Sequence, residues 1–316
     1  MGPLKLKPLL IARPWGGRAL VERYGKQAPE DGSPLGETWE ASDLPGRVSV
    51  VASGPYEGKT ITEVLGRPLP VLIKLIDARD NLSIQVHPDE QAAGEIGGLA
   101  QPKTEAWHVL WNDPGAGIYF GAKQGVSTDR LLEACASGET AEVLSVMNRF
   151  EVAVGDTIVV PAGTVHAIGP GIVLYEVQQP SDSTYRIFDW GRVGLDGKPR
   201  DLHFNNAQIA IRGPTRSDPR RETELVPGAN PRIMLCRQPA FRLDLVLVDR
   251  GELVLPESRH VTFVTAAGGS GWVRSDLGEE EIRVGDTFCI PPETDLMLKP
   301  GNRGLRLLHA RIPKQS

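Results

Sequence analysis

Apolar residues occur in short runs along this chain, separated by turns rich in glycine, proline and aspartate. Six runs have the length and the β-branched content of strands: residues 71–76, 82–87, 106–111, 117–121, 156–161 and 171–179. Helical patterns are few. The clearest spans residues 127–138, with a serine or threonine that can cap its start and Gly138 at its end. Shorter candidates span 61–66 and 89–97, so the pattern predicts a mainly β protein with a few short helices.

One segment of the chain is repeated. GDTIVVPA at residues 155–162 is echoed by GDTFCIPP at 285–292, in register over a turn and the strand that follows it. Shortly after the first copy comes His166, whereas the second copy has Leu296 at the corresponding place. A chance recurrence of a common Gly-Asp turn is the alternative. The repeat predicts two related β units, only the first of which carries the histidine.

A change in composition marks the boundary between these units. Residues 213–230 are polar and rich in proline, glycine and charge, as in linkers between domains. We therefore expect a catalytic unit over residues 1–212 and a second, metal-free β unit over 231–316. The second unit is expected to serve packing or to cover sheet edges.

Composition agrees with a globular fold. Hydrophobic residues make up 40% of the 316 positions, enough for a buried core, and the 26 prolines and 35 glycines suit a chain with many turns. Forty acidic and 35 basic residues give a net charge of −5, and neither sign forms a run. A nucleic-acid groove or a basic membrane patch therefore has no support, and an anionic substrate must be held by a few local cations.

Other sequence features bear on location. The apolar run at residues 9–12 is too short for a signal-peptide core, and no stretch approaches the ~18 apolar residues of a membrane span. Cys135, Cys236 and Cys289 are odd in number and far apart, without a C-x-x-C pair. These features predict a cytoplasmic protein without a disulfide framework.

Two histidines and a carboxylate are placed to bind a metal. His166 ends a G-x5-P-x-G-x2-H pattern that resembles the second motif of the cupin superfamily. Gln85 and His87 lie at i and i+2 of a predicted strand, so they face the same side, and Glu105 begins another strand. Two imidazoles, one carboxylate and one weak oxygen donor suit a catalytic zinc with room for substrate. Taken singly, each could instead be an ordinary core or surface residue.

Six motifs together resemble one family. They are RPWGG (13–17), GETWE (36–40), NLSIQVHPDE (81–90), KTEAWHVL (103–110), GDTIVVPAGTVHAIG (155–169) and STYRIFDWGR (183–192). Their order and residues are similar to those of type I mannose-6-phosphate isomerase in its short bacterial form. The similarity is strong over residues 8–210 and loose over the C-terminal third.

The resemblance implies a fold, a cofactor and an activity. The fold is two cupin-type jelly-roll barrels, and the cofactor is one Zn²⁺ per chain bound by Gln85, His87, Glu105 and His166. The activity is the interconversion of mannose 6-phosphate and fructose 6-phosphate, with Arg186 as the active-site arginine. Only 17 residues separate His87 from Glu105, which leaves no space for the large helical insertion of longer members.

The chemistry of this reaction requires such residue types. Moving a proton between C1 and C2 of a sugar passes through a cis-enediol, and a divalent cation stabilises the negative charge that develops on its oxygens. The guanidinium of Arg186 stays charged and can assist. Its alternative role is a structural ion pair with Asp182 or Asp189.

The substrate phosphate needs donors away from the metal. Lys74 is a lone charge on an apolar strand, which is costly unless it has a task, and Ser83 lies on the same strand face as Gln85. Lys103 is a further cation near Glu105, and Trp15 is a candidate wall for the sugar. Each of the four could instead be a plain surface or core residue.

The general base stays open at this point. A metal-bound water, Glu176, Lys103 and His108 are all candidates, and only geometry can separate them. Three further histidines lie outside the motifs and receive no role: His203, His260 and His309.

Two other functions compete with an isomerase of a phosphorylated hexose. Two histidines and a carboxylate also form the facial triad of non-haem iron, so a cupin oxygenase is the first alternative. The second is a non-catalytic cupin that binds a sugar phosphate. Gln85 as an additional ligand, with the cations Lys74 and Arg186, favours the phosphorylated sugar. Neither nucleic acid nor membrane is expected as a partner.

Overall fold

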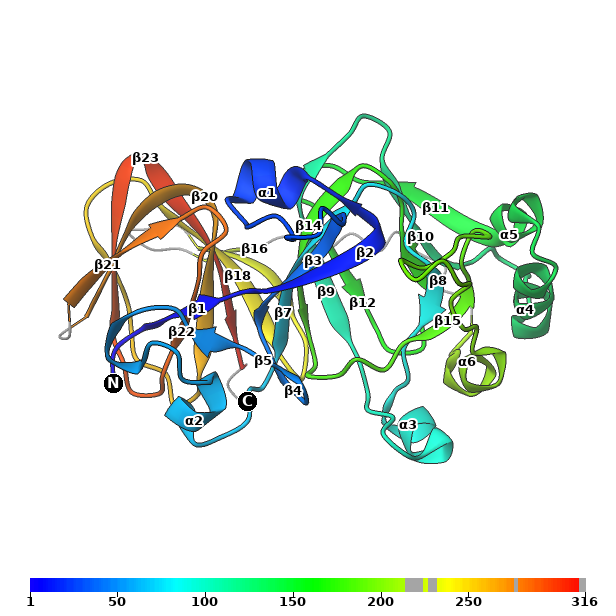
Figure 1. Ribbon diagram of the computed structural model, residues 1–316, viewed down its shortest axis with the longest axis horizontal. Coiled ribbons are helices and arrows are strands. Elements are labelled where there is room, and N and C mark those ends of the chain that lie inside the picture. Colours follow the sequence, from blue (N-terminus) through cyan, green and yellow to red (C-terminus); the bar gives the residue numbers. More distant parts are fainter. Residues whose placement is uncertain (214–223, 227–231, 276–277, 313–316) are drawn as a thin grey trace.

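The computed structural model describes residues 1–213, 224–226, 232–275 and 278–312. Strands dominate it, and Figure 1 shows them gathered in two lobes, with most of the helices at the outer end of one lobe. The predicted mainly β fold with a few short helices is thus confirmed.

The larger lobe is built from antiparallel sheets of residues that precede the predicted linker. Its six-stranded sheet has the order β12 (Thr157–Val160), β9 (Glu105–Asn112), β14 (Ile172–Gln178), β7 (Leu72–Ala78), β3 (Leu35–Ala41) and β2 (Leu9–Gly17). Its five-stranded sheet has the order β11 (Met147–Glu151), β10 (Gly117–Ala122), β13 (His166–Ile168), β8 (Ile84–Val86) and β15 (Tyr185–Phe188). A small pair consists of β4 (Asp43–Leu44) and β5 (Arg47–Val48). Each predicted strand has its counterpart among these.

The other lobe is a ten-stranded sheet. Its main path is β16 (Glu224–Val226), β17 (Arg232–Arg237), β18 (Arg242–Val248), β23 (Leu296–Arg311), β20 (Thr262–Ser275), β22 (Thr287–Ile290), β1 (Leu4–Lys7) and β6 (Val50–Val51). Off this path, β19 (Leu253–Leu255) pairs with β23, and β21 (Gly278–Arg283) pairs with β20. Two strands near the N-terminus therefore complete the C-terminal sheet.

The strand pairing tests only part of the predicted division into two units and a linker. Most of the expected linker, 213–230, lies outside the described residues, and within it residues 224–226 form β16. Among the described strands no sheet closes on itself. The boundaries between the units and the two closed jelly-roll barrels therefore stay predictions.

The helices are short. They are α1 (Ala19–Tyr24), α2 (Ile61–Leu65), α3 (Glu90–Ile96), α4 (Thr128–Ala136), α5 (Thr140–Val146) and α6 (Phe204–Ala210), with a 3-10 turn at Gly54–Tyr56. The predicted helices α2, α3 and α4 are confirmed, and the Ser127 hydroxyl caps α4 by accepting from the Arg130 backbone N–H. None of the helices in the described part of the chain is long and apolar enough to cross a membrane.

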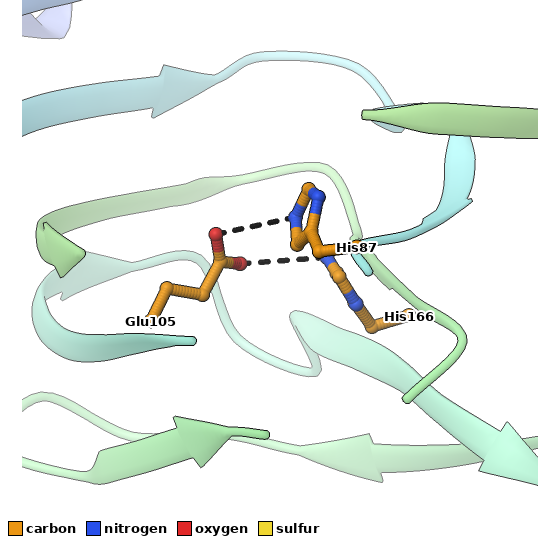
Figure 2. A group of neighbouring side chains, drawn as sticks. All are labelled: His87, Glu105 and His166. Carbon is orange, nitrogen blue, oxygen red and sulfur yellow. Dashed lines mark ion pairs between the residues drawn. The ribbon is translucent and has the colours of Figure 1, made fainter. Parts of the chain in front are cut away.

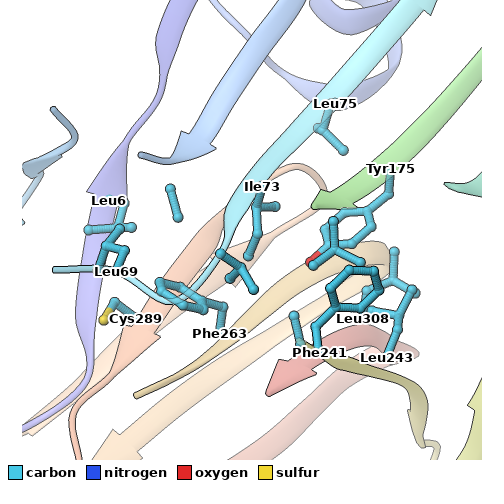
Figure 3. Packing of buried hydrophobic residues seen from close by; sticks show 14 of the residues in the cluster. Leu6, Leu69, Ile73, Leu75, Tyr175, Phe241, Leu243, Phe263, Cys289 and Leu308 are labelled. Atoms are coloured by element: carbon cyan, nitrogen blue, oxygen red, sulfur yellow. The ribbon is translucent and has the colours of Figure 1, made fainter. Parts of the chain in front are cut away.

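A continuous apolar core joins the two lobes. Ile73 and Tyr175, on β7 and β14, belong to the same buried cluster as Phe241, Phe263 and Leu308 of the C-terminal sheet (Figure 3). All five side chains are essentially inaccessible to water. The C-terminal lobe thus packs firmly against the other lobe.

The sequence repeat is also a repeat of structure. At the first turn the Asp156 carboxylate accepts a hydrogen bond from the Ala153 N–H at 2.8 Å, and at the second Asp286 accepts from the Arg283 N–H at 2.9 Å. Each turn leads into a strand of four residues, β12 or β22.

Candidate metal centre

Three of the four predicted ligands meet between the five-stranded and six-stranded sheets. His87 directly follows β8, Glu105 begins β9 and His166 begins β13. The Nε2 atom of His87 lies 3.3 Å from Glu105 Oε2, and that of His166 lies 3.4 Å from Glu105 Oε1 (Figure 2). One ligand atom from each residue falls within 4.8 Å of the other two, and all three side chains are buried. The cluster is therefore compact enough to surround one ion.

Backbone carbonyls fix how the two imidazoles face the carboxylate. His87 donates from Nδ1 to the Ser183 carbonyl at 2.8 Å, and His166 donates from Nδ1 to the Thr164 carbonyl at 2.8 Å. A carbonyl can only accept, so the proton of each neutral ring sits on Nδ1. Both Nε2 lone pairs are then directed to the cluster, as in metal-binding histidines.

Burial sets the charges of the cluster. Removal from water lowers the pKa of His87 to about 4, assisted by the nearby Lys103 cation, and burial also lowers the pKa of His166. Burial alone would raise the pKa of Glu105, but the Lys103 ammonium holds it well below its usual value. Two neutral imidazoles and one carboxylate are the forms that bind a metal.

The donor atoms fit a divalent ion. Both oxygens of Glu105 are buried and lack a well-aligned hydrogen bond to any described residue. The Lys103 ammonium compensates the charge of Glu105, with Nζ at 2.7 Å from Oε2 and 3.3 Å from His87 Nε2. Two nitrogens and a carboxylate are a common donor set for catalytic zinc, and they also suit iron. Within the described chain no other group of three such donors is found.

The fourth predicted ligand is at the edge of the cluster. Gln85 Nε2 lies 3.4 Å from His166 Nε2, and Gln85 Oε1 accepts a hydrogen bond from the Ser83 hydroxyl at 3.1 Å. To offer its oxygen to an ion, the amide would have to turn over, and the Ser83 hydroxyl would then accept from the amide nitrogen instead of donating to the oxygen. Ser83 can therefore hold Gln85 in either orientation, and it is also a candidate for substrate binding.

A small cavity of about 50 Å³ adjoins the cluster. Among the residues that line it are Lys74, Gln85, Lys103, Glu105, His166 and Glu176. Its volume holds one or two water molecules. Binding of a hexose phosphate therefore requires side chains of this lining to move.

Lys74 lies in the cavity wall between two carboxylates. Its Nζ is 3.2 Å from Glu176 Oε1 and 3.8 Å from Glu37 Oε2, and it stands 5.0 Å from the centre of the Trp39 ring. Burial would lower the pKa of Lys74, but Glu176 and Glu37 raise it overall. The ammonium is thus charged and already engaged, with one of its three donors left for a ligand.

Arg186 is outside the lining of this cavity and has no described carboxylate within ion-pair distance. On β15 it is directly opposite Gln85 of β8. Its Nη1 donates to the Asp201 carbonyl at 2.9 Å, while Nε is buried without a partner among the described residues. Asp182 and Asp189 are both paired with other arginines. Burial lowers the pKa of Arg186 to about 10. The alternative of a structural ion pair to either aspartate is not realised.

Two predicted candidates lie away from the cavity. Trp15 is 3% exposed and belongs to the apolar core with Ile76 and Trp107, outside the cavity lining. His108 lies on the face of β9 opposite to that of Glu105, because the two are three positions apart on one strand. Its Nδ1 is 2.9 Å from the Thr157 hydroxyl. Position therefore argues against His108 as the general base.

Sequence reasoning did not assign a role to the groups that orient the two acids beside Lys74. The Trp107 indole donates to Glu176 Oε2 at 2.9 Å, and the Trp39 indole donates to Glu37 Oε2 at 2.7 Å. Glu37 and Trp39 lie in the GETWE motif, which was the only signal for them. The orienting carbonyls of Ser183 and Thr164 had no signal at all, since any residue provides one.

Comparison with known proteins gives consistent results. A family model described as "Phosphomannose isomerase type I, catalytic domain" matches residues 4–106. Mannose-6-phosphate isomerase of Streptococcus mutans is 32% identical over 306 residues, covering 92% of each chain. Mannose-6-phosphate isomerase ManA of Bacillus subtilis is 37% identical over 237 residues, covering 70% of this chain and 71% of the relative.

Solved structures agree. The crystal structure of the mannose 6-phosphate isomerase from Bacillus subtilis has a TM-score of 0.86 at 30% identity, over 99% of this chain and all of the other. The apo form of the enzyme from Salmonella typhimurium, at 17% identity, has the same fold, with a TM-score of 0.75 over 99% of both chains. The resemblance found in the six motifs is confirmed, and the chain belongs to the type I phosphomannose isomerase family.

Proposed function

We propose that this chain interconverts mannose 6-phosphate and fructose 6-phosphate at the cavity beside His87, Glu105 and His166. The observation that carries the proposal is the buried cluster itself, with its two oriented neutral imidazoles and a carboxylate whose charge Lys103 compensates. Relatives that cover most of the chain bear the name of this isomerase. A zinc ion held by these three residues, with Gln85 as a fourth ligand, is part of the proposal.

The reaction moves one proton between C1 and C2 of the sugar through a cis-enediol. Zinc, when bound, supplies Lewis-acid stabilisation of the oxygen charge without redox chemistry of its own. Arg186 is the further electrostatic group, because its guanidinium lacks a carboxylate and keeps its positive charge for the developing negative charge. The Nδ1 hydrogen bonds of His87 and His166 hold the ligand set in place before substrate arrives.

Glu176 is the proposed general base. It lines the cavity, the Trp107 indole donates to its Oε2 at 2.9 Å, and its Oε1 lies 3.2 Å from the Lys74 ammonium. When the lining opens and Lys74 moves to the phosphate, Oε1 can accept a proton from the sugar and return it at the neighbouring carbon. Lys103 also lines the cavity, but its ammonium faces Glu105 and is a donor rather than a base.

The phosphate requires cations and hydroxyls near the cavity. Lys74 and Lys103 line it, and Ser83 is hydrogen-bonded to Gln85 in its wall. We assign these three to the phosphorylated hexose, and they act when the lining opens. Trp15 contributes a wall to the sugar only if that movement uncovers it, since it is now in the core.

Solvent deuterium tests the proposed path. Metal-loaded protein in D2O should convert mannose 6-phosphate to fructose 6-phosphate and place deuterium at C2 of the aldose and C1 of the ketose. Glu176→Gln, which keeps the metal ligands, should slow both conversion and exchange. Binding of the sugar phosphate without either would favour the non-catalytic alternative. Iron in the purified protein, with oxygen uptake, would favour the oxygenase.

A further inference from the structure

A second and much larger cavity lies in the C-terminal sheet. Its volume is about 1000 Å³, at the upper end of the range for sites that bind small metabolites. Arg232 of β17 lines it, as do His309 and Arg311 of β23. Thr262, the first residue of β20, and Leu296, the first residue of β23, complete this part of the wall.

Strand register makes this cavity the counterpart of the metal centre. Strands β12 and β22 each follow one copy of the repeated turn. Val160, the last residue of β12, pairs with Glu105, and Ile290, the last residue of β22, pairs with Thr262. Thr262 therefore has the place that Glu105 has in the other lobe. In the same way Leu296 has the place of His166, since each lies eleven positions after the glycine of its turn and begins a strand. Two metal ligands are thus replaced by residues that bind no metal.

The neighbouring strands extend the correspondence. Glu176 pairs with Trp107, which is two positions after Glu105. His309 pairs with Val264, which is two positions after Thr262. Across the next strand pair, Lys74 faces Glu176, and Asp244 faces His309. The C-terminal sheet therefore keeps the frame of the cavity and carries different charges in it.

Positive charge is in excess around Asp244. This carboxylate is fully buried and pairs with Arg242 at 2.7 Å and with Arg311 at 2.9 Å. Arg232 is half-buried, lies two positions before the residue of β17 that pairs with Asp244, and has no hydrogen bond or ion pair to a described residue. Three guanidiniums and one carboxylate are thus close enough to interact electrostatically. Burial and the neighbouring Arg311 lower the pKa of Arg232. An anion bound between Arg232 and Arg311 would balance this charge.

The unpartnered Nδ1 of His309 indicates a ligand in the part of the cavity that Arg232 and Arg311 line. His309 is 6% exposed, and its Nδ1 has no partner among the described residues. A buried ring nitrogen without a partner is costly. Burial, with Arg311 close by, lowers the pKa of His309 to about 3, so the ring is neutral and can donate one hydrogen bond to an anion.

The outer part of the cavity suits a polyhydroxylated group. Ser258 and Thr294 provide hydroxyls, Glu257 and Glu293 provide carboxylates, and Leu255 provides an apolar surface. Carboxylates repel a second phosphate but accept hydrogen bonds from sugar hydroxyls. The remaining charged groups of the lining, Arg259 and His260, are exposed at the rim.

We propose that this cavity is a second, metal-independent binding site for a phosphorylated sugar or sugar alcohol. Its phosphate contacts Arg232 and Arg311, and its hydroxyls contact the outer hydroxyls and carboxylates. The site does not depend on the isomerase reaction, because none of its residues lines the catalytic cavity.

Glucitol 6-phosphate is a suitable probe, since it has no carbonyl group and cannot be isomerised. Isothermal titration of the full chain, loaded with zinc, should find two equivalents bound per chain. Arg232→Gln should remove one equivalent, or weaken it at least tenfold, while kcat and KM for mannose 6-phosphate stay unchanged. Arg303→Gln, an exposed arginine of the same sheet outside the cavity lining, should bind like the native chain.

Several outcomes would overturn the proposal. They are one equivalent in the native chain that Arg232→Gln leaves unchanged, an equal loss in Arg232→Gln and Arg303→Gln, or inorganic phosphate binding at this site as tightly as glucitol 6-phosphate. If Arg232→Gln does not fold, Glu257→Gln replaces it, since the exposed Glu257 carboxylate is assigned to the sugar hydroxyls, and it should weaken the same equivalent. A failure of isomerase activity would leave the stoichiometry informative, because the two sites are measured separately.

Discussion

Replacing Glu105 by glutamine separates its role as a metal ligand from its role as the partner of Lys103. The two side chains form a buried ion pair, with Nζ and Oε2 2.7 Å apart and side-chain exposures of 4% and 1%. Glutamine keeps the shape of Glu105 and removes its charge. The variant is left with the Lys103 ammonium buried beside two imidazoles.

The size of the effect follows from this burial. Removing one partner of a buried ion pair costs about 3–5 kcal/mol, because the other charge stays buried without compensation. The double variant Lys103→Met/Glu105→Gln removes both charges, so that no uncompensated charge stays buried. We expect it to recover most of the lost free energy of unfolding. Neither variant should recover zinc binding.

Two assays on each variant check these expectations. Urea unfolding of metal-free protein gives the free energies of unfolding of the native chain, both single variants and the double variant. Competition with a chelator gives the zinc affinity, which should fall by more than the 10–100-fold that outer partners of metal ligands contribute. Lys103→Met alone should bind zinc at least as well as the native chain, since the ammonium no longer competes for Glu105.

The reasoning is refuted by either of two results. If Glu105→Gln binds zinc with native affinity, Glu105 is not a ligand. If the double variant is no more stable than Glu105→Gln, then the uncompensated Lys103 charge is not the cause of the loss.

Four further predictions concern single residues. Arg186→Ala should keep its zinc content, measured by elemental analysis, while kcat falls at least about 100-fold; loss of zinc would contradict its role. Ser83→Ala should raise KM for mannose 6-phosphate about tenfold or more through loss of a hydrogen bond to a charged group. Lys74→Met should raise KM for mannose 6-phosphate far more than KM for free mannose, and an equal rise for both sugars would remove Lys74 from the phosphate site. Burial lowers the pKa of His309 to about 3, so the neutral ring contributes stability above pH 6.5, and this contribution declines as the pH falls toward 3. Between pH 7.5 and 5.5 the free energy of unfolding of the native chain, measured with urea and without ligand, should therefore fall by about 1 kcal/mol more than that of His309→Gln.

Local pattern was sufficient for much of the fold. Six strands of the larger lobe were predicted because each is a short apolar run between turns, as in residues 71–76 and 171–179, whereas β11, β13 and β15 were not. Helices α1, α5 and α6 were not predicted. Unlike α2, α3 and α4, none of the three has a side-chain hydrogen bond that caps its N-terminus, so the sequence carries no start signal for them.

Contacts between distant segments were beyond the sequence. Strand β1 completes the C-terminal sheet by pairing with β22, nearly three hundred positions further along the chain. A short apolar strand carries no signal for such a distant partner. Spacing and motif found His87, Glu105 and His166. They did not reveal that Lys103 pairs with Glu105, or that Lys74 lies between Glu37 and Glu176.

Faces of strands decide which candidates reach the cavity. His108 was one of four candidates for the base, and its parity relative to Glu105 on β9 directs it to the opposite face. Trp15 lies in a motif of the family, yet it packs in the core. Such assignments need the pairing of strands, which a single sequence does not give.

The central claim is that isomerisation depends on a divalent ion at His87, Glu105 and His166. The most direct measurement is the rate of conversion of mannose 6-phosphate to fructose 6-phosphate, in a coupled assay, before chelation, after chelation and after zinc is added back. We expect activity to be lost on chelation and restored by zinc in the native chain, with no restoration in His166→Ala. Full activity in the chelated, metal-free protein would contradict the account.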